Sequence, residues 1–284
     1  MLVCKTIKEV KEVLSQYREQ GQSIGFVPTM GALHRGHISL IEKAKAENNI
    51  VLSSIFVNPT QFNNPNDLIN YPRTFDIDIN MLEESGCDVV FFPTVEMMYP
   101  NESYPDIDLG GLDLVMEGRF RQGHFKGVAT IVKKFFEILN PTRAYFGEKD
   151  YQQFLIIKHI AKTYFPKIFI IPCPIIREND GLAMSSRNML LNEKERETAS
   201  LINKELKNII IKYKEKNIQD LITQSVSFLN EQPNTKVEYI VVANQETLEI
   251  SDTIEKEGLR LFAAVYVGKV RLIDNIKLFC NFAS

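Results

Sequence analysis

Short apolar runs alternate with amphipathic segments through the first part of the chain. Five runs have the length of strands, at residues 24–27, 50–57, 89–92, 144–146 and 168–171. The run at 50–57 (IVLSSIFV) is almost continuously apolar, which is typical of a strand buried on both faces. Between the runs, apolar residues at helical spacing predict helices at 33–46, 74–85, 128–139 and 152–164. This alternation predicts an α/β fold with a doubly wound parallel sheet.

The pattern changes near residue 192. Asn192 followed three residues later by Glu195 is typical of a capped helix start, and polar helices are predicted at 193–215 and 218–230. Strands near 237–242, 259–267 and 270–276 follow, the last two joined as a hairpin at Gly268-Lys269. We therefore expect a first domain of residues 1–176 and a smaller C-terminal α+β domain of residues 177–284.

Composition narrows the function without naming it. The 284 residues are 44% hydrophobic and 24% charged with a net charge of −3, which gives no broad reason to expect nucleic-acid or membrane binding. The N-terminus is not a secretory signal and no apolar run is long enough to span a bilayer, so we expect a cytoplasmic protein. The four cysteines lie far apart in the chain and predict reduced, mostly buried thiols: Cys4, Cys87, Cys173 and Cys280.

The strongest candidate for chemistry is the segment PTMGALHRGH at residues 28–37. It joins a buried strand to a helix, and a helix N-terminus attracts anions through its unpaired N–H groups and its dipole. His34 and His37 there can stabilise charge on a transferring phosphate, while Gly31 and Gly36 allow close approach of a nucleotide. On its own, H-x-G-H is equally consistent with two surface histidines.

Other polar loops follow strands of the same predicted sheet, and in such sheets ligands bind beyond the carboxyl ends of the strands. Residues 147–150 (GEKD) offer a lysine to phosphate, and residues 184–188 (MSSRN) offer two hydroxyls and a guanidinium. Residues 58–62 (NPTQF) carry amides suited to a small polar substrate, and residues 119–127 form a local basic cluster. Each loop alone can equally be a capped turn or a solvated surface.

In combination these segments resemble a known family. The motifs P-T-M-G-A-L-H-x-G-H, N-P-x-Q-F, Y-P-R, G-H-F-x-G-V, F-G-x-K-D-x-Q-Q and S-S-R-N occur in this order, followed by R-L-I-D-N at residues 271–275. The set resembles the pantoate–β-alanine ligases of the HxGH nucleotidyltransferase superfamily, from about residue 25 to residue 275. H-x-G-H alone would indicate only the superfamily.

The resemblance implies a reaction and an architecture. Pantoate would attack the α-phosphorus of ATP to give pantoyl adenylate and pyrophosphate, and β-alanine would then displace AMP to give pantothenate. It implies Mg²⁺ accompanying ATP, a homodimer, and a Rossmann-like N-terminal domain whose site the C-terminal domain covers.

The resemblance also implies site residues. His37, His34, Lys149 and Arg187 would be catalytic, Gln61 and Gln153 would bind pantoate, and Gln61 would also meet β-alanine. Arg35 lies where a smaller or acidic residue is common in the family, and Arg121 and His124 receive no role. The ATP contacts would be Met30, Gly31, Ala32, Leu33, His34, Arg35, Gly36, His37, Gly147, Glu148, Lys149, Asp150, Ile176, Met184, Ser185, Ser186 and Arg187.

Three alternatives stay open at this stage. The first is another nucleotidyltransferase with a stable nucleotide product, against which the two glutamines and the S-S-R-N loop argue. The second is a non-catalytic ATP-binding module, which would form no AMP. The third, a zinc protein, has little support because the histidines and cysteines form no ligand quartet.

Overall fold

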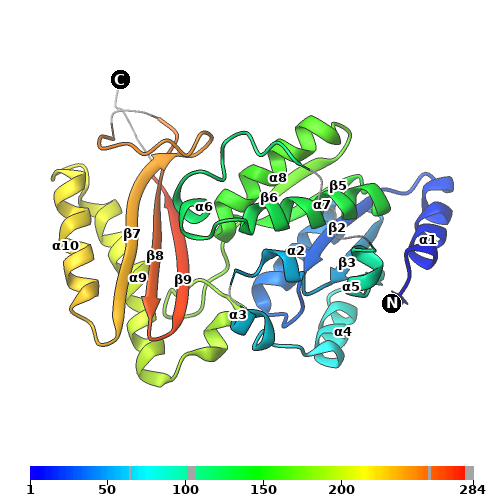
Figure 1. Cartoon of the computed structure of the whole chain (residues 1–284), viewed down its shortest axis with the longest axis horizontal. Coiled ribbons are helices and arrows are strands. Elements are labelled where there is room, and N and C mark those ends of the chain that lie inside the picture. Colours follow the sequence, from blue (N-terminus) through cyan, green and yellow to red (C-terminus); the bar gives the residue numbers. More distant parts are fainter. Residues whose placement is uncertain (64, 101–105, 255–256, 279–284) are drawn as a thin grey trace. The chain divides into compact units, whose positions relative to one another are not determined.

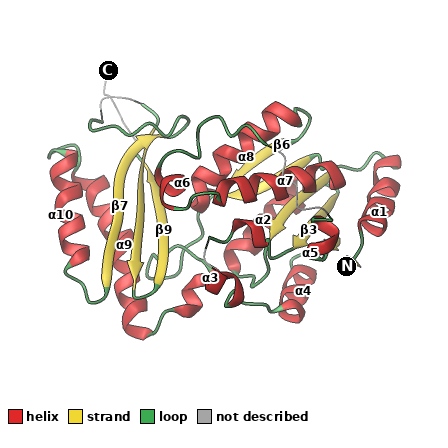
Figure 2. Cartoon of the chain, viewed as in Figure 1, coloured by secondary structure: helices red, strands yellow, loops and turns green. Residues whose placement is uncertain are grey.

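The computed structural model describes residues 1–63, 65–100, 106–254 and 257–278 (Figures 1 and 2). The chain divides into two compact units: an N-terminal unit of Met1–Glu148 and Gln152–Pro174, and a C-terminal unit of Lys149–Tyr151 and Ile175–Ser284. The division after Pro174 lies two residues before the expected end of the first domain, but residues 149–151 group with the C-terminal unit. Cys280 lies outside the described residues.

The N-terminal unit is built on a six-stranded parallel sheet in the order β1-β4-β3-β2-β5-β6. The strands are β1 (Leu2–Cys4), β2 (Ile24–Thr29), β3 (Ile50–Ile55), β4 (Val89–Phe91), β5 (Arg143–Gly147) and β6 (Phe169–Cys173). The longer helices are α1 (Ile7–Glu19), α2 (Arg35–Glu47), α4 (Phe75–Glu84), α7 (His124–Leu139) and α8 (Tyr151–Tyr164). Short helical segments are η1 (Pro59–Gln61), α3 (Pro65–Ile69), α5 (Val95–Met98), α6 (Met116–Phe120) and η2 (Glu148–Asp150).

Neighbouring residues of the strands bury their side chains toward opposite faces of this sheet. Val27 of β2 lies in one apolar cluster with Ile41 of α2 and Leu82 of α4. Phe26 packs instead edge-to-face on Phe135 of α7, with 5.5 Å between ring centroids. Helices therefore cover both faces, which confirms the predicted doubly wound sheet.

The order of the strands reverses beside β2. From β2 the chain moves outward to β3 and β4 on one side, and it later returns to place β5 and β6 on the other. The carboxyl ends of β2 and β5 therefore flank the switch point, where open α/β sheets bind their ligands. The segments that follow these two ends are residues 30–37 and 148–150.

The start of α1 has a capping sequence that is independent of the apolar pattern. Thr6 accepts a hydrogen bond from the Glu9 amide, and the Glu9 carboxylate accepts one from the Thr6 amide. This capping box starts α1, whose Val10 and Leu14 are fully buried. The sequence T-x-x-E at residues 6–9 is the signature that could have predicted α1.

The C-terminal unit has a three-stranded antiparallel sheet in the order β7-β8-β9. Its elements are η3 (Ser186–Leu190), α9 (Glu193–Lys212), α10 (Ile218–Asn230), β7 (Thr235–Asn244), β8 (Leu259–Val267) and β9 (Val270–Lys277). Leu261, Ala263 and Val265 of β8 pack with Leu206 of α9 and Leu221 of α10. The two helices cover one face of this sheet, as the predicted α+β arrangement requires.

The three described cysteines are free, buried thiols, as expected. Burial raises the pKa of Cys87 to about 12 and that of Cys173 to about 12, so both stay protonated at neutral pH. Among the described residues, no helix has the length and apolarity needed to cross a membrane.

Candidate active site

The loop between β2 and α2 holds residues 30–34 of the H-x-G-H segment in an unusual backbone conformation. Gly31 and Ala32 both have positive φ, 81° and 49°. The Asp78 carboxylate of α4 accepts the amides of Ala32 and Leu33 at 3.0 and 2.8 Å, and also the Thr74 hydroxyl at 3.1 Å. Asp78 is buried, so one carboxylate 45 residues away along the chain fixes this turn.

His34 and His37 form the cap at the N-terminus of α2. Nδ1 of His34 accepts the Gly36 amide at 3.1 Å, and Nδ1 of His37 accepts the His34 amide at 3.3 Å. Because each Nδ1 is an acceptor, the proton of each neutral ring lies on Nε2. The ring centroids are 4.1 Å apart. Both rings therefore lie at a helix N-terminus with Nδ1 bonded to the main chain, and a helix N-terminus is suited to binding an anion.

Arg35 between the histidines is exposed and makes a two-bond ion pair with Glu42, at 2.6 and 3.0 Å. Glu42 also raises the pKa of Arg35 through this hydrogen bond and its charge. The guanidinium is thus paired with Glu42. Any contact of Arg35 with ATP is therefore expected to come from its main chain.

Gln61 lies at the end of η1, directly after Asn58-Pro59-Thr60. Its Nε2 is 2.7 Å from the Met30 sulfur, which brings the predicted pantoate ligand and the predicted ATP loop together. Buried Asn58 uses its amide nitrogen on Gln61 Oε1 at 3.2 Å and on the Gly127 carbonyl at 3.1 Å. The Asn58 side-chain amide was suggested from the sequence as a substrate ligand. In the structure it instead stabilises the turn.

The motif G-H-F-x-G-V, which had no role from the sequence, supports the same turn from α7. Nδ1 of buried His124 is 2.8 Å from the Gln61 carbonyl, and because a carbonyl only accepts, Nδ1 is the donor. A Cβ on Gly127 would lie 2.2 Å from the Thr60 carbonyl oxygen, so only glycine permits this approach of α7 to η1.

The two glutamines at the start of α8 differ in what they contact. Gln152 is buried and fully used within the fold: it accepts the Glu117 amide at 3.0 Å and donates to the carbonyls of Leu112 and Val115. Gln153 is half-buried, and its side chain makes no hydrogen bond to the described part of the chain. Of these two glutamines, Gln153 is thus the one whose side-chain amide is not already used within the described part of the chain.

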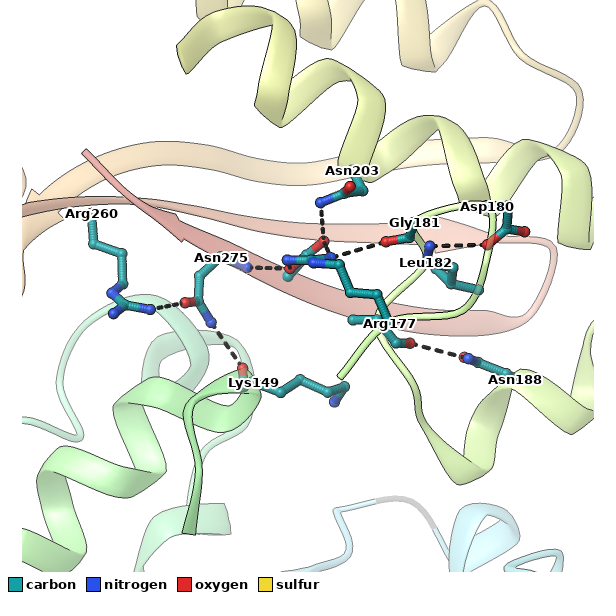
Figure 3. A network of polar contacts seen from close by, with 11 residues as sticks. Lys149, Arg177, Asp180, Gly181, Leu182, Asn188, Asn203, Arg260 and Asn275 are labelled. Atoms are coloured by element: carbon teal, nitrogen blue, oxygen red, sulfur yellow. Dashed lines mark hydrogen bonds and ion pairs between the residues drawn. The ribbon is translucent and has the colours of Figure 1, made fainter. Parts of the chain in front are cut away.

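Lys149 and Asp150 follow β5 but belong to the C-terminal unit. Lys149 Nζ lies 3.5 Å from Asp150 Oδ1, and the Lys149 carbonyl accepts the side-chain amide of Asn275 on β9 at 3.0 Å. The next residue, Tyr151, lies with its ring 3.8 Å from the guanidinium carbon of Arg260. The strand β9 therefore holds this short segment by the Lys149 carbonyl (Figure 3), and β8 contacts it through the Tyr151 ring.

Ile176 and Met184 lie opposite each other in a small hairpin of the C-terminal unit. The Met184 amide donates to the Ile176 carbonyl at 3.0 Å, and Arg177 pairs with Ala183 in an antiparallel bridge. Gly181, with φ 95°, makes the turn. Residues 175–184 thus form an ordered arm that carries two predicted ATP contacts.

Residues 185–187 follow the arm as the start of η3. Ser185 caps η3 by accepting the Arg187 amide at 3.3 Å, and Ser186 is buried. The Asn188 side chain ties η3 to the arm through the Ala183 carbonyl at 3.1 Å (Figure 3). The cap leaves the donors of residues 185–187 on a single tight turn.

The described residues contain no cluster of three or more His, Cys, Asp or Glu side chains that could hold a metal ion. The predicted site residues fall into two groups. Residues 30–37, 61, 147, 148 and 153 lie in the N-terminal unit, and residues 149, 150, 176 and 184–187 lie in the C-terminal unit.

Comparisons with known proteins decide the family. The profile of the pantoate–β-alanine ligases matches residues 2–277. The chain belongs to this family. Pantothenate synthetase of Caldicellulosiruptor bescii is 44% identical over 278 residues, covering 97% of this chain and 98% of that protein. That of Clostridium botulinum (strain Kyoto) is 45% identical over 277 residues, covering 97% and 98%.

Solved structures of the family agree with the fold. The Thermus thermophilus pantothenate synthetase superposes with a TM-score of 0.91 at 36% identity, covering 98% of this chain and 100% of that one. A Francisella tularensis pantoate–β-alanine ligase, complexed with β-γ ATP and β-alanine, gives a TM-score of 0.82 at 39% identity, covering 98% and 97%. The resemblance is confirmed, and the chain is an ATP-dependent pantoate–β-alanine ligase.

Proposed function

We propose that the chain makes pantothenate in two steps through an enzyme-bound acyl adenylate. A carboxylate oxygen of pantoate attacks the α-phosphorus of ATP, and the bond to pyrophosphate breaks. The amine of β-alanine then attacks the acyl carbon, the bond to AMP breaks, and the amine loses a proton. In the first step an anionic carboxylate attacks an anionic triphosphate, and in the second a neutral amine attacks the acyl adenylate. Catalysis therefore consists mainly of aligning the reactants and stabilising the charge on phosphate.

The carrying observation is the pair of imidazole rings of His34 and His37 at the N-terminus of α2, each with its Nδ1 accepting a main-chain amide. Charge grows on the phosphate oxygens as the carboxylate attacks, and preorganised donors are worth most where charge develops. We assign His34 and His37 to the triphosphate, with Lys149, Ser185, Ser186 and Arg187 as the further phosphate donors. The main chain of residues 30–36, residues 147, 148 and 150, Ile176 and Met184 complete the proposed ATP contacts.

For pantoate we propose Gln61 and Gln153, with Gln61 also meeting β-alanine. Gln61 is supported by its contact with Met30 and by the rigid turn that carries it. Amides suit a substrate that has both hydroxyl and carboxylate groups, because each amide donates and accepts.

We propose that Mg²⁺ enters with ATP. This ion takes oxygen ligands and is commonly bound through substrate phosphates and one or two carboxylates. The half-exposed Asp150 offers such an oxygen beside the proposed phosphate donor Lys149. Mg²⁺ would neutralise phosphate charge.

The homodimer stays a prediction from the resemblance.

Product analysis tests the function directly. Protein incubated with ATP, Mg²⁺, pantoate and β-alanine should form AMP and pantothenate in equal amounts. With pantoate alone it should exchange labelled pyrophosphate into ATP, since the first step is reversible. Folded protein that forms AMP but no pantothenate would contradict the proposed reaction. So would pyrophosphate exchange in the absence of pantoate.

We expect His124→Ala to raise the KM for pantoate about fivefold, because the loss of one hydrogen bond of about 1 kcal/mol releases the turn that carries Gln61. His124→Asn should stay near the parent, since its amide nitrogen can take the place of Nδ1 as donor. Steady-state kinetics at saturating ATP gives both values. Equal KM values for the alanine variant and the parent would contradict this role of His124.

A further inference from the structure

Two neighbouring polar residues on β9, Asp274 and Asn275, are buried within the C-terminal sheet, at 5% and 2% exposure. In the register of the sheet, Asp274 pairs with Ala263 and Asn275 pairs with Phe262. Ala263 belongs to the apolar face that α9 and α10 cover, so Asp274 lies on that face and Asn275 on the opposite one. The strand therefore offers one polar group to each face.

The orientation of the Asn275 amide is fixed by its two partners (Figure 3). The buried Arg260 guanidinium donates to Asn275 Oδ1. An arginine only donates, so the oxygen must face Arg260 and Nδ2 must face the Lys149 carbonyl, which it reaches at 3.0 Å. Asn275 is therefore oriented to donate its side-chain amide to the main chain of Lys149.

Asp274 holds the main chain of Asn275 and ties it to the arm. Its Oδ1 accepts the Asn275 amide at 2.7 Å. Arg177 makes two bonds to the same carboxylate, at 2.7 and 2.8 Å, and Arg177 also donates to the Gly181 carbonyl at 3.0 Å. Asn203 of α9 adds a bond at 3.3 Å. The charge of Asp274 is thus paired and fully bonded, as a buried carboxylate requires.

We propose that Asn275 is a positioning residue for Lys149. Arg260 fixes its side-chain amide, and Asp274 fixes its main-chain amide. The inference rests on the proposed role of Lys149 as a phosphate donor. Residues 149–151 lie between segments of the N-terminal unit in sequence but group with the C-terminal unit, where Arg260 of β8 and Asn275 of β9 contact them. Donors that stabilise a transition state must be held within a fraction of an ångström, so the main chain behind Lys149 matters for its rate effect.

The variant Asn275→Asp separates positioning from folding. The new carboxylate keeps an acceptor for Arg260 and adds an ion pair there, but it places an oxygen against the Lys149 carbonyl in place of the amide donor. We expect pantoate-dependent pyrophosphate exchange to fall roughly 10- to 100-fold in kcat, with the KM for pantoate unchanged. Asn275→Ala, which removes the donor without adding charge, is expected to act in the same direction.

Gln232→Glu is the matched control. Gln232 also donates its side-chain amide to a main-chain carbonyl of the C-terminal unit, that of Phe228 at 3.0 Å, and the change adds the same charge. This variant should exchange pyrophosphate at the parental rate. Thermal unfolding of all variants checks that they are folded at the assay temperature.

The closing experiment compares Lys149→Ala, Asn275→Asp and the double variant. If Asn275 acts through Lys149, the double variant loses no more activity than Lys149→Ala alone. Losses that multiply, or an Asn275→Asp variant at the parental rate while Lys149→Ala is impaired, would overturn the positioning role alone. A Lys149→Ala variant at the parental rate would overturn the proposed function of Lys149 together with this inference.

Discussion

His34→Asn and His37→Gln are expected to keep α2 intact while lowering pantoate-dependent pyrophosphate exchange by about a hundredfold or more each. Asparagine is among the best N-cap residues, and glutamine at the third helical position completes a capping box. Both replacements supply the oxygen that accepts the main-chain amide now bound by Nδ1. Asparagine is too short to place its NH₂ group where Nε2–H lies, and in glutamine the NH₂ group shares a carbon with the oxygen that caps α2 and is therefore displaced from that place.

The measurement pairs activity with stability. Urea unfolding should give a free energy of unfolding equal to the parent or up to about 1 kcal/mol higher for His34→Asn, because histidine is the weaker cap. His159→Ala, on the polar side of α8, is the control and should exchange pyrophosphate normally. A folded His37→Gln variant with parental exchange would show that the ring serves only as a cap.

The apolar pattern predicted five of the six strands of the parallel sheet because apolar runs alternate with regular amphipathic helices. The expected runs at 24–27, 50–57 and 89–92 became β2, β3 and β4, and the helix expected at 128–139 is the greater part of α7. Strand order and the position of the switch point followed only from the structure. Both depend on which strands pair, and the sequence of a single strand does not indicate its partner.

The motifs predicted where chemistry would gather but not what each residue does. Asn58 and Gln152 carry the same functional groups as the proposed substrate ligands Gln61 and Gln153, yet both amides are spent inside the fold. The sequence cannot distinguish them, because the difference is made by partners far away in the chain. The same reason hid His124, whose acceptor is the carbonyl of Gln61.

Asp78 was missed for a related reason. It lies within the predicted helix at 74–85, where a carboxylate is ordinarily a solvated residue. Its burial and its bonds to residues 32 and 33 arise from the packing of α4 against the β2–α2 loop. A buried aspartate that accepts consecutive amides is a fixed part of the loop, so its removal tests the loop as a whole.

Asp78→Asn is expected to lower the free energy of unfolding by about 2–3 kcal/mol, the size of lost bonds to a buried charged group. The amide retains one oxygen, so at least one N–H of Ala32 or Leu33 would face an NH₂ group. The positive φ of Ala32 costs roughly 1–2 kcal/mol by itself, and the carboxylate is what holds it there. The loop before His34 should therefore relax, and exchange activity should fall about tenfold or more through displacement of the pair of histidines.

Asp76→Asn is the matched control for this change. Asp76 lies in the first turn of the same helix and is exposed, so its loss should cost no more than about 0.5 kcal/mol through the helix dipole. Urea unfolding and pantoate-dependent exchange, measured on both variants at a temperature where each is folded, compare the two sites directly. Equal unfolding midpoints and equal exchange rates for the two variants would mean that the β2–α2 loop keeps its conformation without the Asp78 carboxylate. In that case the turn at Gly31 and Ala32 would have to be held by the packing of α2 alone.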